Sequence, residues 1–135
     1  MTAREEGSLT HAPDSKAQIL VPLDQEVSFT LHHMLRFYLK LYPVPRSVAA
    51  FSLGALKQVV QSLAPRDASA ASPARLSLRA TRHRLRLKLR LPPGRRATPR
   101  LAARLRQAPV GVVAALETSR KGATFTLVAE IPEKG

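Results

Sequence analysis

The chain has 135 residues, a formal net charge of +13 at pH 7 and a hydrophobic content of 44%, which suffices for one domain with one core. It contains no Cys, which excludes disulfides, zinc–thiolate sites and thiol catalysis. It also has no apolar run long enough to span a membrane, and residues 1–15 lack the pattern of a secretory signal. We therefore expect a cytoplasmic protein with no membrane partner, and its richness in Arg, Ala, Leu and Pro suggests a bacterial origin.

The positive charge is concentrated in one segment. Residues 68–116 contain twelve basic and no acidic side chains, whereas the rest of the chain has ten basic and nine acidic ones, a net charge of +1. A basic stretch without acidic neighbours creates a strong positive potential and attracts anions. The segment therefore predicts an acidic partner.

The chain begins with a polar segment and a short apolar one. Residues 1–16 indicate a flexible tail. Residues 18–23 predict a first strand, in which Pro22 suits a strand end or an edge position.

A long helix should follow the first strand. Asp24 suits its N-cap and Glu26 its first turn, where the helix dipole favours an acid, and Pro43 ends it. Apolar residues recur at helical spacing and widen the apolar face, so we expect this helix to be largely buried. These residues are Val27, Phe29, Leu31, Met34, Leu35, Phe37, Tyr38, Leu39, Leu41 and Tyr42.

A second helix is predicted between Ser47, which can cap it, and Pro65, which ends it. Its inner stripe should consist of Val48, Phe51, Ala55, Val59 and Leu63. Residues 66–74 are rich in Ala and Ser and indicate a mobile linker.

From residue 75 the apolar period changes from 3.6 to 2. Leucines alternate with basic residues over 75–81 and again over 84–91, on either side of a turn near 82–83. This pattern predicts a β-hairpin with one leucine face and one basic face. The basic face should hold Arg75, Arg79, Arg84, Arg86, Lys88 and Arg90.

The rest of the chain predicts a short helix and a final strand. Residues 92–94 break the hairpin strand, and residues 98–99 fit the N-cap and first position of the helix. Residues 110–116 are apolar and fit either helix or strand, whereas residues 120–122 indicate a turn and residues 123–131 alternate as a strand. This order of elements predicts an α/β (α+β) two-layer sandwich with helices on one face of a mixed or antiparallel sheet.

The order resembles the ATP-binding domain of histidine kinases and anti-sigma-factor kinases, the GHKL fold. Residues 117–127, followed by Ile-Pro at 131–132, look like the Gly-Lys-Gly-Thr-x-Phe hairpin and last strand of that family. Residues 56–60 look like its N-box helix, and residues 91–106 stand where its Asp-x-Gly-x-Gly loop and lid should follow the hairpin. The resemblance implies a single domain over residues 17–135.

The residues at the family's nucleotide site differ from its motifs. The N box supplies a Glu that activates water and an Asn that binds magnesium, but here the nearby residues are Gln58, Gln61 and Ser62, and the chain has no Asn. The loop that should supply the adenine-binding Asp contains Gly94 and no acid, and Gly122 lies in the final turn. The resemblance therefore implies a degenerate, non-catalytic member, to which Mg-ATP binds only if that site still functions.

The basic hairpin is the main candidate site. We expect an acidic partner or polyanion to bind Arg75, Arg79, Arg84, Arg86, Lys88, Arg90, Arg95 and Arg96. Like charges across a sheet destabilise it, and a bound polyanion offsets this cost. The alternative is a solvated charged face that guards a sheet edge. The basic segment has no aromatic residue for stacking on bases, which leaves binding to a nucleic-acid backbone or to an acidic protein of the sigma-factor or response-regulator type.

Three functions therefore remain open: a non-catalytic regulatory binding module, a nucleic-acid-binding protein, and an ATP-binding kinase-type domain with atypical site residues. No metal site is expected, because the four His lack metal-ligand spacing. His32 and His33 in the first helix fit either a phosphoacceptor or ordinary surface imidazoles. A homodimer through that helix is plausible, since GHKL regulators often pair.

Overall fold

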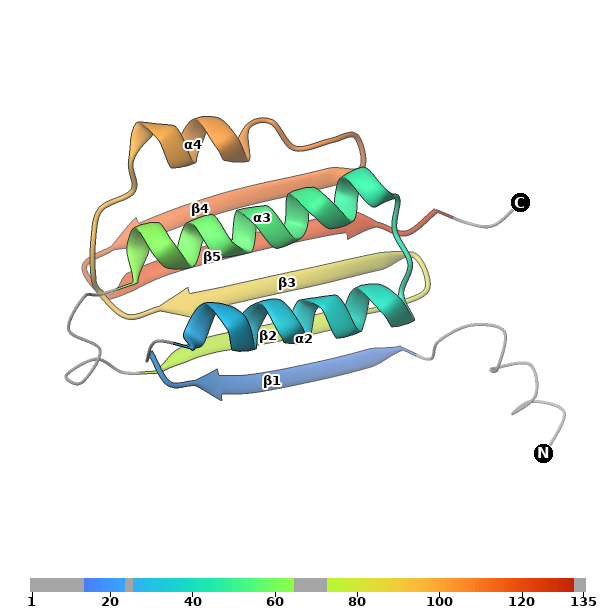
Figure 1. The fold of residues 1–135 in the computed structure, drawn as a ribbon, viewed down its shortest axis with the longest axis horizontal. Coiled ribbons are helices and arrows are strands. Elements are labelled where there is room, and N and C mark those ends of the chain that lie inside the picture. The colour runs from blue at the N-terminus through green and yellow to red at the C-terminus, as the bar shows by residue number, and fades with distance from the viewer. Residues whose placement is uncertain (1–13, 24–25, 65–72, 133–135) are drawn as a thin grey trace, which may run out of the picture.

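In the part of the chain that the structure describes, five antiparallel strands form one sheet and three helices lie on one of its faces (Figure 1). The computed structural model describes residues 14–23, 26–64 and 73–132. The strands are β1 (Ser15–Val21), β2 (Ala74–Ala80), β3 (Arg84–Leu91), β4 (Val112–Ser119) and β5 (Gly122–Glu130), and the helices are α2 (Val27–Leu41), α3 (Arg46–Leu63) and α4 (Pro99–Leu105). The strand order is β1-β2-β3-β5-β4, which leaves β1 and β4 at the edges. The predicted two-layer α+β sandwich is confirmed.

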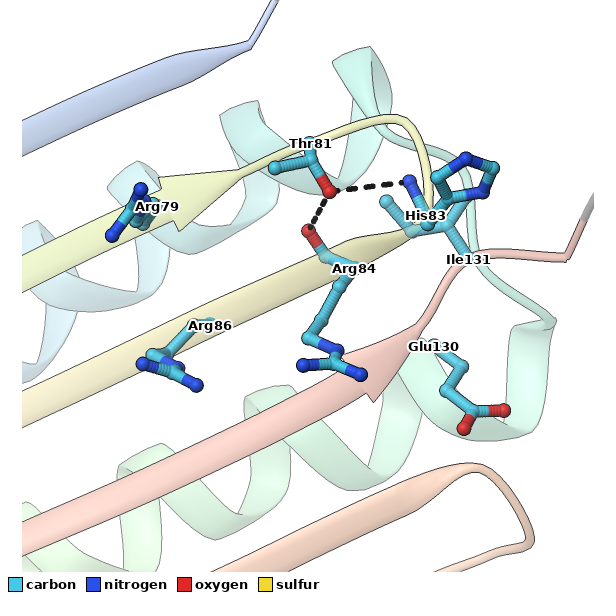
Figure 2. A pocket seen from close by; sticks show the side chains of 7 residues that line it. All are labelled: Arg79, Thr81, His83, Arg84, Arg86, Glu130 and Ile131. Carbon is cyan, nitrogen blue, oxygen red and sulfur yellow. Dashed lines mark hydrogen bonds between the residues drawn. The ribbon is translucent and has the colours of Figure 1, made fainter.

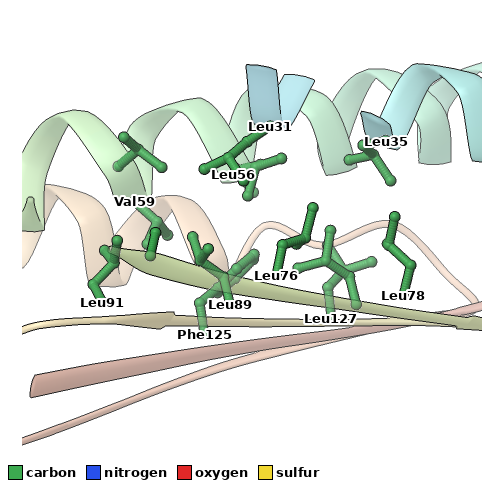
Figure 3. Close-up of a cluster of buried hydrophobic side chains, with 14 of the residues drawn as sticks. Leu31, Leu35, Leu56, Val59, Leu76, Leu78, Leu89, Leu91, Phe125 and Leu127 are labelled. Carbon is green, nitrogen blue, oxygen red and sulfur yellow. The ribbon is translucent and has the colours of Figure 1, made fainter. Parts of the chain in front are cut away.

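The core lies between the helices and the leucine face of the β2–β3 hairpin. Every second residue of these strands is buried, because successive side chains of a strand point to opposite faces of the sheet. Leu76, Leu89 and Phe125 pack below Leu31 and Leu56 of the helices (Figure 3). A slip of one residue would turn the leucines to solvent, so their burial fixes the register of the strands.

Helix α2 is less buried than the sequence predicts. Phe29, Phe37 and Leu41 are 72%, 53% and 45% exposed, which contradicts the expectation of a largely buried helix. These side chains are exposed because α2 lies at the rim of the helix layer (Figure 1). It contacts α3 on one side and the sheet near its β1 edge, and the rest of its surface is open. Its buried residues form one stripe of Val27, Leu31, Leu35 and Tyr38. A homodimer through α2 stays a prediction.

Two predicted strand boundaries are corrected. Ser15 and Lys16, assigned by the sequence pattern to the tail, belong to β1, where they pair with Ala80 and Arg79. Ala74, assigned to the linker, is the first residue of β2 and is fully buried. Residues 1–13 and 66–72 of the predicted tail and linker lie outside the described residues. Pro22 directly follows the edge strand β1, as expected.

The predicted caps of the two long helices are not found. Asp24 lies outside the described residues, and Glu26 occupies the N-cap position of α2 without a side-chain capping bond. Ser47 lies inside α3, whose N-cap position is held by Pro45. With Pro45 as the N-cap, the helix begins at Arg46, two residues earlier than it would with a Ser47 cap. Within the described residues, no helix combines the length and apolarity needed to cross a membrane.

The C-terminal elements follow the sequence pattern. Thr98 caps α4, where its Oγ1 accepts a hydrogen bond of 3.2 Å from the Leu101 backbone N–H, and Pro99 takes the first helical position. Residues 112–116 of the ambiguous segment belong to strand β4, which pairs with β5.

Gly122 is the residue on which the β4–β5 turn depends. Its φ is +135°, and a Cβ atom there would overlap the carbonyl oxygen of Leu91. Replacing Gly122 with Ala should therefore lower the free energy of unfolding by about 1–3 kcal/mol, measured by urea denaturation. Gly94→Ala is the matched control, because Gly94 is exposed and has no positive φ. Equal effects of the two substitutions would contradict this role.

Candidate functional site

The face of the sheet opposite the helices, which we call the open face, is covered by no described helix (Figure 1). Strand pairing arranges its side chains in rows that run across the sheet in the order β1-β2-β3-β5-β4. The three complete rows are Lys16–Arg79–Arg86–Val128–Val113, Gln18–Ser77–Lys88–Thr126–Ala115 and Leu20–Arg75–Arg90–Thr124–Glu117.

The cations of β2 and β3 all lie on this face and form what we call the basic band. Its members are Arg75, Arg79, Arg84, Arg86, Lys88 and Arg90. Lys88, in the middle row, is half-buried and the five arginines are exposed. The alternation that buries the leucines therefore places these six side chains side by side, as the hairpin pattern predicts. Their role in binding stays a prediction.

Like charges oppose one another within the basic band. Arg75 pairs in register with Arg90, and Arg79 pairs with Arg86. One cation of the band has an acid directly opposite it on the neighbouring strand: Arg84, at one end of β3, pairs with Glu130 of β5. Like charges directly across a sheet repel, so this arrangement costs stability that the leucine face must supply.

Protection of a sheet edge does not account for the band. The strand order makes β2 and β3 interior strands, with both edges of each paired. Protection of an edge is therefore ruled out for these six cations, and a merely solvated charged face stays the untested alternative. Lys16, at the edge strand β1, fits the role of an edge guard, and it also extends the row of Arg79 and Arg86. Lys16 is not among the residues predicted for the site, although its alternation with Gln18 and Leu20 places it on the same face of a strand.

A shallow cleft of about 440 Å³ lies at the end of the band beside the β2–β3 turn (Figure 2). It is lined by Arg79, Thr81, His83, Arg84, Arg86, Glu130 and Ile131. The turn is held by a 3.3 Å hydrogen bond from the His83 backbone N–H to Thr81 Oγ1, and by a 2.8 Å bond from the Ile131 N–H to the His83 carbonyl. The guanidinium groups here are suited to donate to a carboxylate or phosphate oxygen.

Arg95 and Arg96 do not join the basic band. The Arg95 guanidinium donates to the carbonyl oxygens of Gln61 and Ala64, the latter at 3.2 Å, and so caps the C-terminal end of α3. Arg95 therefore lies beside α3 and not among the cations of the hairpin, and its predicted role in partner binding stays a prediction. Arg96 is exposed in the segment between β3 and α4.

The positions matched to the nucleotide site lie away from the open face, around the C-terminal end of α3. Gln58 and Ser62 are half-buried on α3, and Gln61 is exposed there. Gly94 lies in the segment that Arg95 ties to α3, and Gly122 packs against the end of β3. These five residues thus share one end of the domain (Figure 1), where α3 offers no carboxylate. Among the described residues no group of His, Asp and Glu could hold a metal ion.

The two helix histidines differ in environment. His32 is half-buried, and burial together with Arg36 and Lys57 lowers its pKa. His33 is exposed, and its ring stacks on Phe29 at a centroid distance of 6.2 Å. Neither is placed beside the basic band, and a phosphoacceptor role remains an untested alternative.

Comparison with known proteins identifies a fold neighbour. No family model matches the chain, and no curated protein matches it either. A solved structure of the RsbU and RsbW domains of Rv1364c from Mycobacterium tuberculosis is similar, with a TM-score of 0.62 and 16% identity over 89% of this chain. This chain spans 34% of that one. At this identity the likeness concerns the fold alone.

The repulsion within the basic band can be measured. Arg79→Gln removes one charge of the Arg79–Arg86 pair and should raise the free energy of unfolding by about 0.2–1 kcal/mol at low salt. The gain should shrink at about 1 M salt, where charges are screened within roughly 3 Å. Arg100→Gln, an equal loss of charge on the exposed side of α4, is the control and should change little. A lower free energy of unfolding for Arg79→Gln would contradict this prediction, because it would mean that Arg79 makes a net stabilising contribution.

Proposed function

We propose that this chain is a non-catalytic regulatory module that docks an acidic partner on the basic band. The observation that carries the proposal is the pairing of Arg75 with Arg90 and of Arg79 with Arg86 on interior strands. An acidic partner would offset the repulsion of these pairs through charge-assisted hydrogen bonds and counterion release.

The fold neighbour supports a regulatory role. RsbW is an anti-sigma-factor kinase, and a domain with its fold is suited to a pathway in which protein partners are bound and released. By analogy we propose an acidic protein of the sigma-factor or response-regulator type as the partner. This step rests on fold likeness and on charge, since the identity is 16%.

The absence of suitable groups on α3 supports the non-catalytic part of the proposal. Phosphoryl transfer needs a ligand for magnesium and a group that positions the nucleophile. Gln58, Gln61 and Ser62 are uncharged, and helix α3 contains no Asp or Glu. These residues are poor substitutes for the Glu and Asn of the family's N box.

A nucleic-acid backbone is the second candidate, favoured by the density of cations on the band. Non-specific binding of this kind needs only phosphate contacts and weakens steeply with salt. Against it, the described open face carries no aromatic side chain on which a base could stack.

Charge reversal tests the proposed surface. Arg86→Glu combined with Arg90→Glu should weaken binding of a fluorescein-labelled oligoglutamate peptide at least tenfold, because each side chain belongs to one of the two like-charge pairs of the band. Both are exposed, so circular dichroism should show an unchanged fold.

The matched control reverses Arg100 and Arg106, which are exposed on and beside α4 and change the net charge equally. It should leave the affinity within about threefold, because long-range attraction alone is a weaker term. Equal losses in the two double variants would mean that total charge, rather than the basic band, attracts the partner.

Calorimetric titration with Mg-ATP tests the kinase-type alternative. We expect no binding heat at millimolar nucleotide, because α3 supplies no carboxylate or Asn for the metal. A saturable heat that is lost on adding EDTA would overturn the non-catalytic assignment and restore the third function.

A further inference from the structure

The open face has a second, uncharged part directly beside the basic band. We call Val113, Ala115, Thr124, Thr126 and Val128 of β4 and β5 the neutral strip. Val113 is 68% exposed, and Val128 stands opposite it in register. Exposed apolar side chains on an interaction face point to a protein partner with an apolar surface of its own.

The strip and the band share a long boundary. Arg86, Lys88 and Arg90 of β3 pair in register with Val128, Thr126 and Thr124 of β5. Each of these three cations therefore has an uncharged neighbour on the next strand, about 5 Å away. A ligand seated on this boundary meets positive charge on one flank and methyl groups on the other.

The dimensions of the boundary fit an α-helix. A helix with its side chains is about 10–12 Å across, which covers between two and three strands spaced at about 4.8 Å. Strand β3 has eight residues, a length of about 27 Å at roughly 3.4 Å per residue. That length corresponds to about 18 residues of helix at about 1.5 Å per residue.

Acids at both ends of the strip make a nucleic-acid ligand a poorer fit. Glu117 completes the row of Arg90 and Thr124 on β4, and Glu130 ends β5 opposite Arg84. A wide polyanion lying on the band would bring phosphates over these carboxylates, which repel them. A helix acidic on one side only avoids this contact.

From these observations we infer that the partner presents an amphipathic α-helix, acidic on one side and apolar on the other. Its acidic side binds the basic band, and its apolar side packs on Val113 and Val128 of the neutral strip. The inference rests on the proposed function, because it names the partner class for the same surface.

Val113→Lys separates the two ligand classes. It replaces an apolar contact with a cation, so it should weaken binding of an amphipathic helix and strengthen binding of a pure polyanion. Lysine is well tolerated on an edge strand such as β4. Val110→Lys is the matched control, since Val110 is 99% exposed and precedes β4.

The probes are three labelled ligands: an 18-residue peptide with Leu on one helical face and Glu on the other, a peptide of the same composition in scrambled order, and duplex DNA. We expect the amphipathic peptide to bind at least about tenfold more tightly than the scrambled one. Val113→Lys should weaken its binding about three- to tenfold, and Val110→Lys should leave it within about twofold. Ala115→Lys, on the same exposed side of β4, serves as a second variant if Val113→Lys misfolds.

Two results would overturn the inference, and they are distinguishable from failure of the proposed function. If Val113→Lys leaves peptide binding unchanged or tightens it while Arg86→Glu/Arg90→Glu abolishes it, the face binds a polyanion and not an amphipathic helix. Tighter binding of duplex DNA than of either peptide would lead to the same conclusion. If the double reversal has no effect on any probe, the proposed function itself is wrong.

Discussion

The alternation of leucine and cation in the β2–β3 hairpin is the constraint on which the rest of the molecule depends. Burial of Leu76, Leu78, Leu85, Leu87 and Leu89 against the helices fixes which way each strand faces. Because neighbouring side chains of a strand point to opposite faces, the same contacts hold the basic side chains on the open face at fixed spacing. The same strand register therefore places the leucines in the core and the cations on the candidate binding surface.

Magnitudes explain why this arrangement folds. Each buried leucine contributes about 1.5–3 kcal/mol, whereas a like-charge pair across a sheet costs about 0.2–1 kcal/mol. The buried leucines of the hairpin therefore outweigh the repulsion of Arg75 with Arg90 and of Arg79 with Arg86. The surface remains charged, pre-organised and without a covering helix in the described chain, which suits docking of an acidic partner at little further cost in ordering.

The parts of the structure that could be predicted are those set by local pattern. The hairpin, the Thr98 cap and the final strand follow from period and turn chemistry alone. The exposure of Phe29 could not, because periodicity does not reveal whether a helix lies at the centre or the rim of its layer. Arg95 caps α3 through a contact between residues more than thirty positions apart, which no local pattern contains. The β4 half of the neutral strip could not be predicted, because residues 110–116 fitted helix and strand equally.

The strand order, which decides whether the cations lie at an edge of the sheet, cannot be predicted from local sequence pattern either. Had β2 or β3 been an edge, its cations would need no explanation other than protection against aggregation. Because β2 and β3 are interior strands, edge protection does not explain their cations. The fold also separates two candidate sites. The positions matched to a nucleotide site surround α3 on the covered face, and the basic band lies on the opposite face. The two share only the backbone of the sheet, so the surface proposed for an acidic helix does not depend on whether Gln58 or Gln61 could serve a nucleotide site.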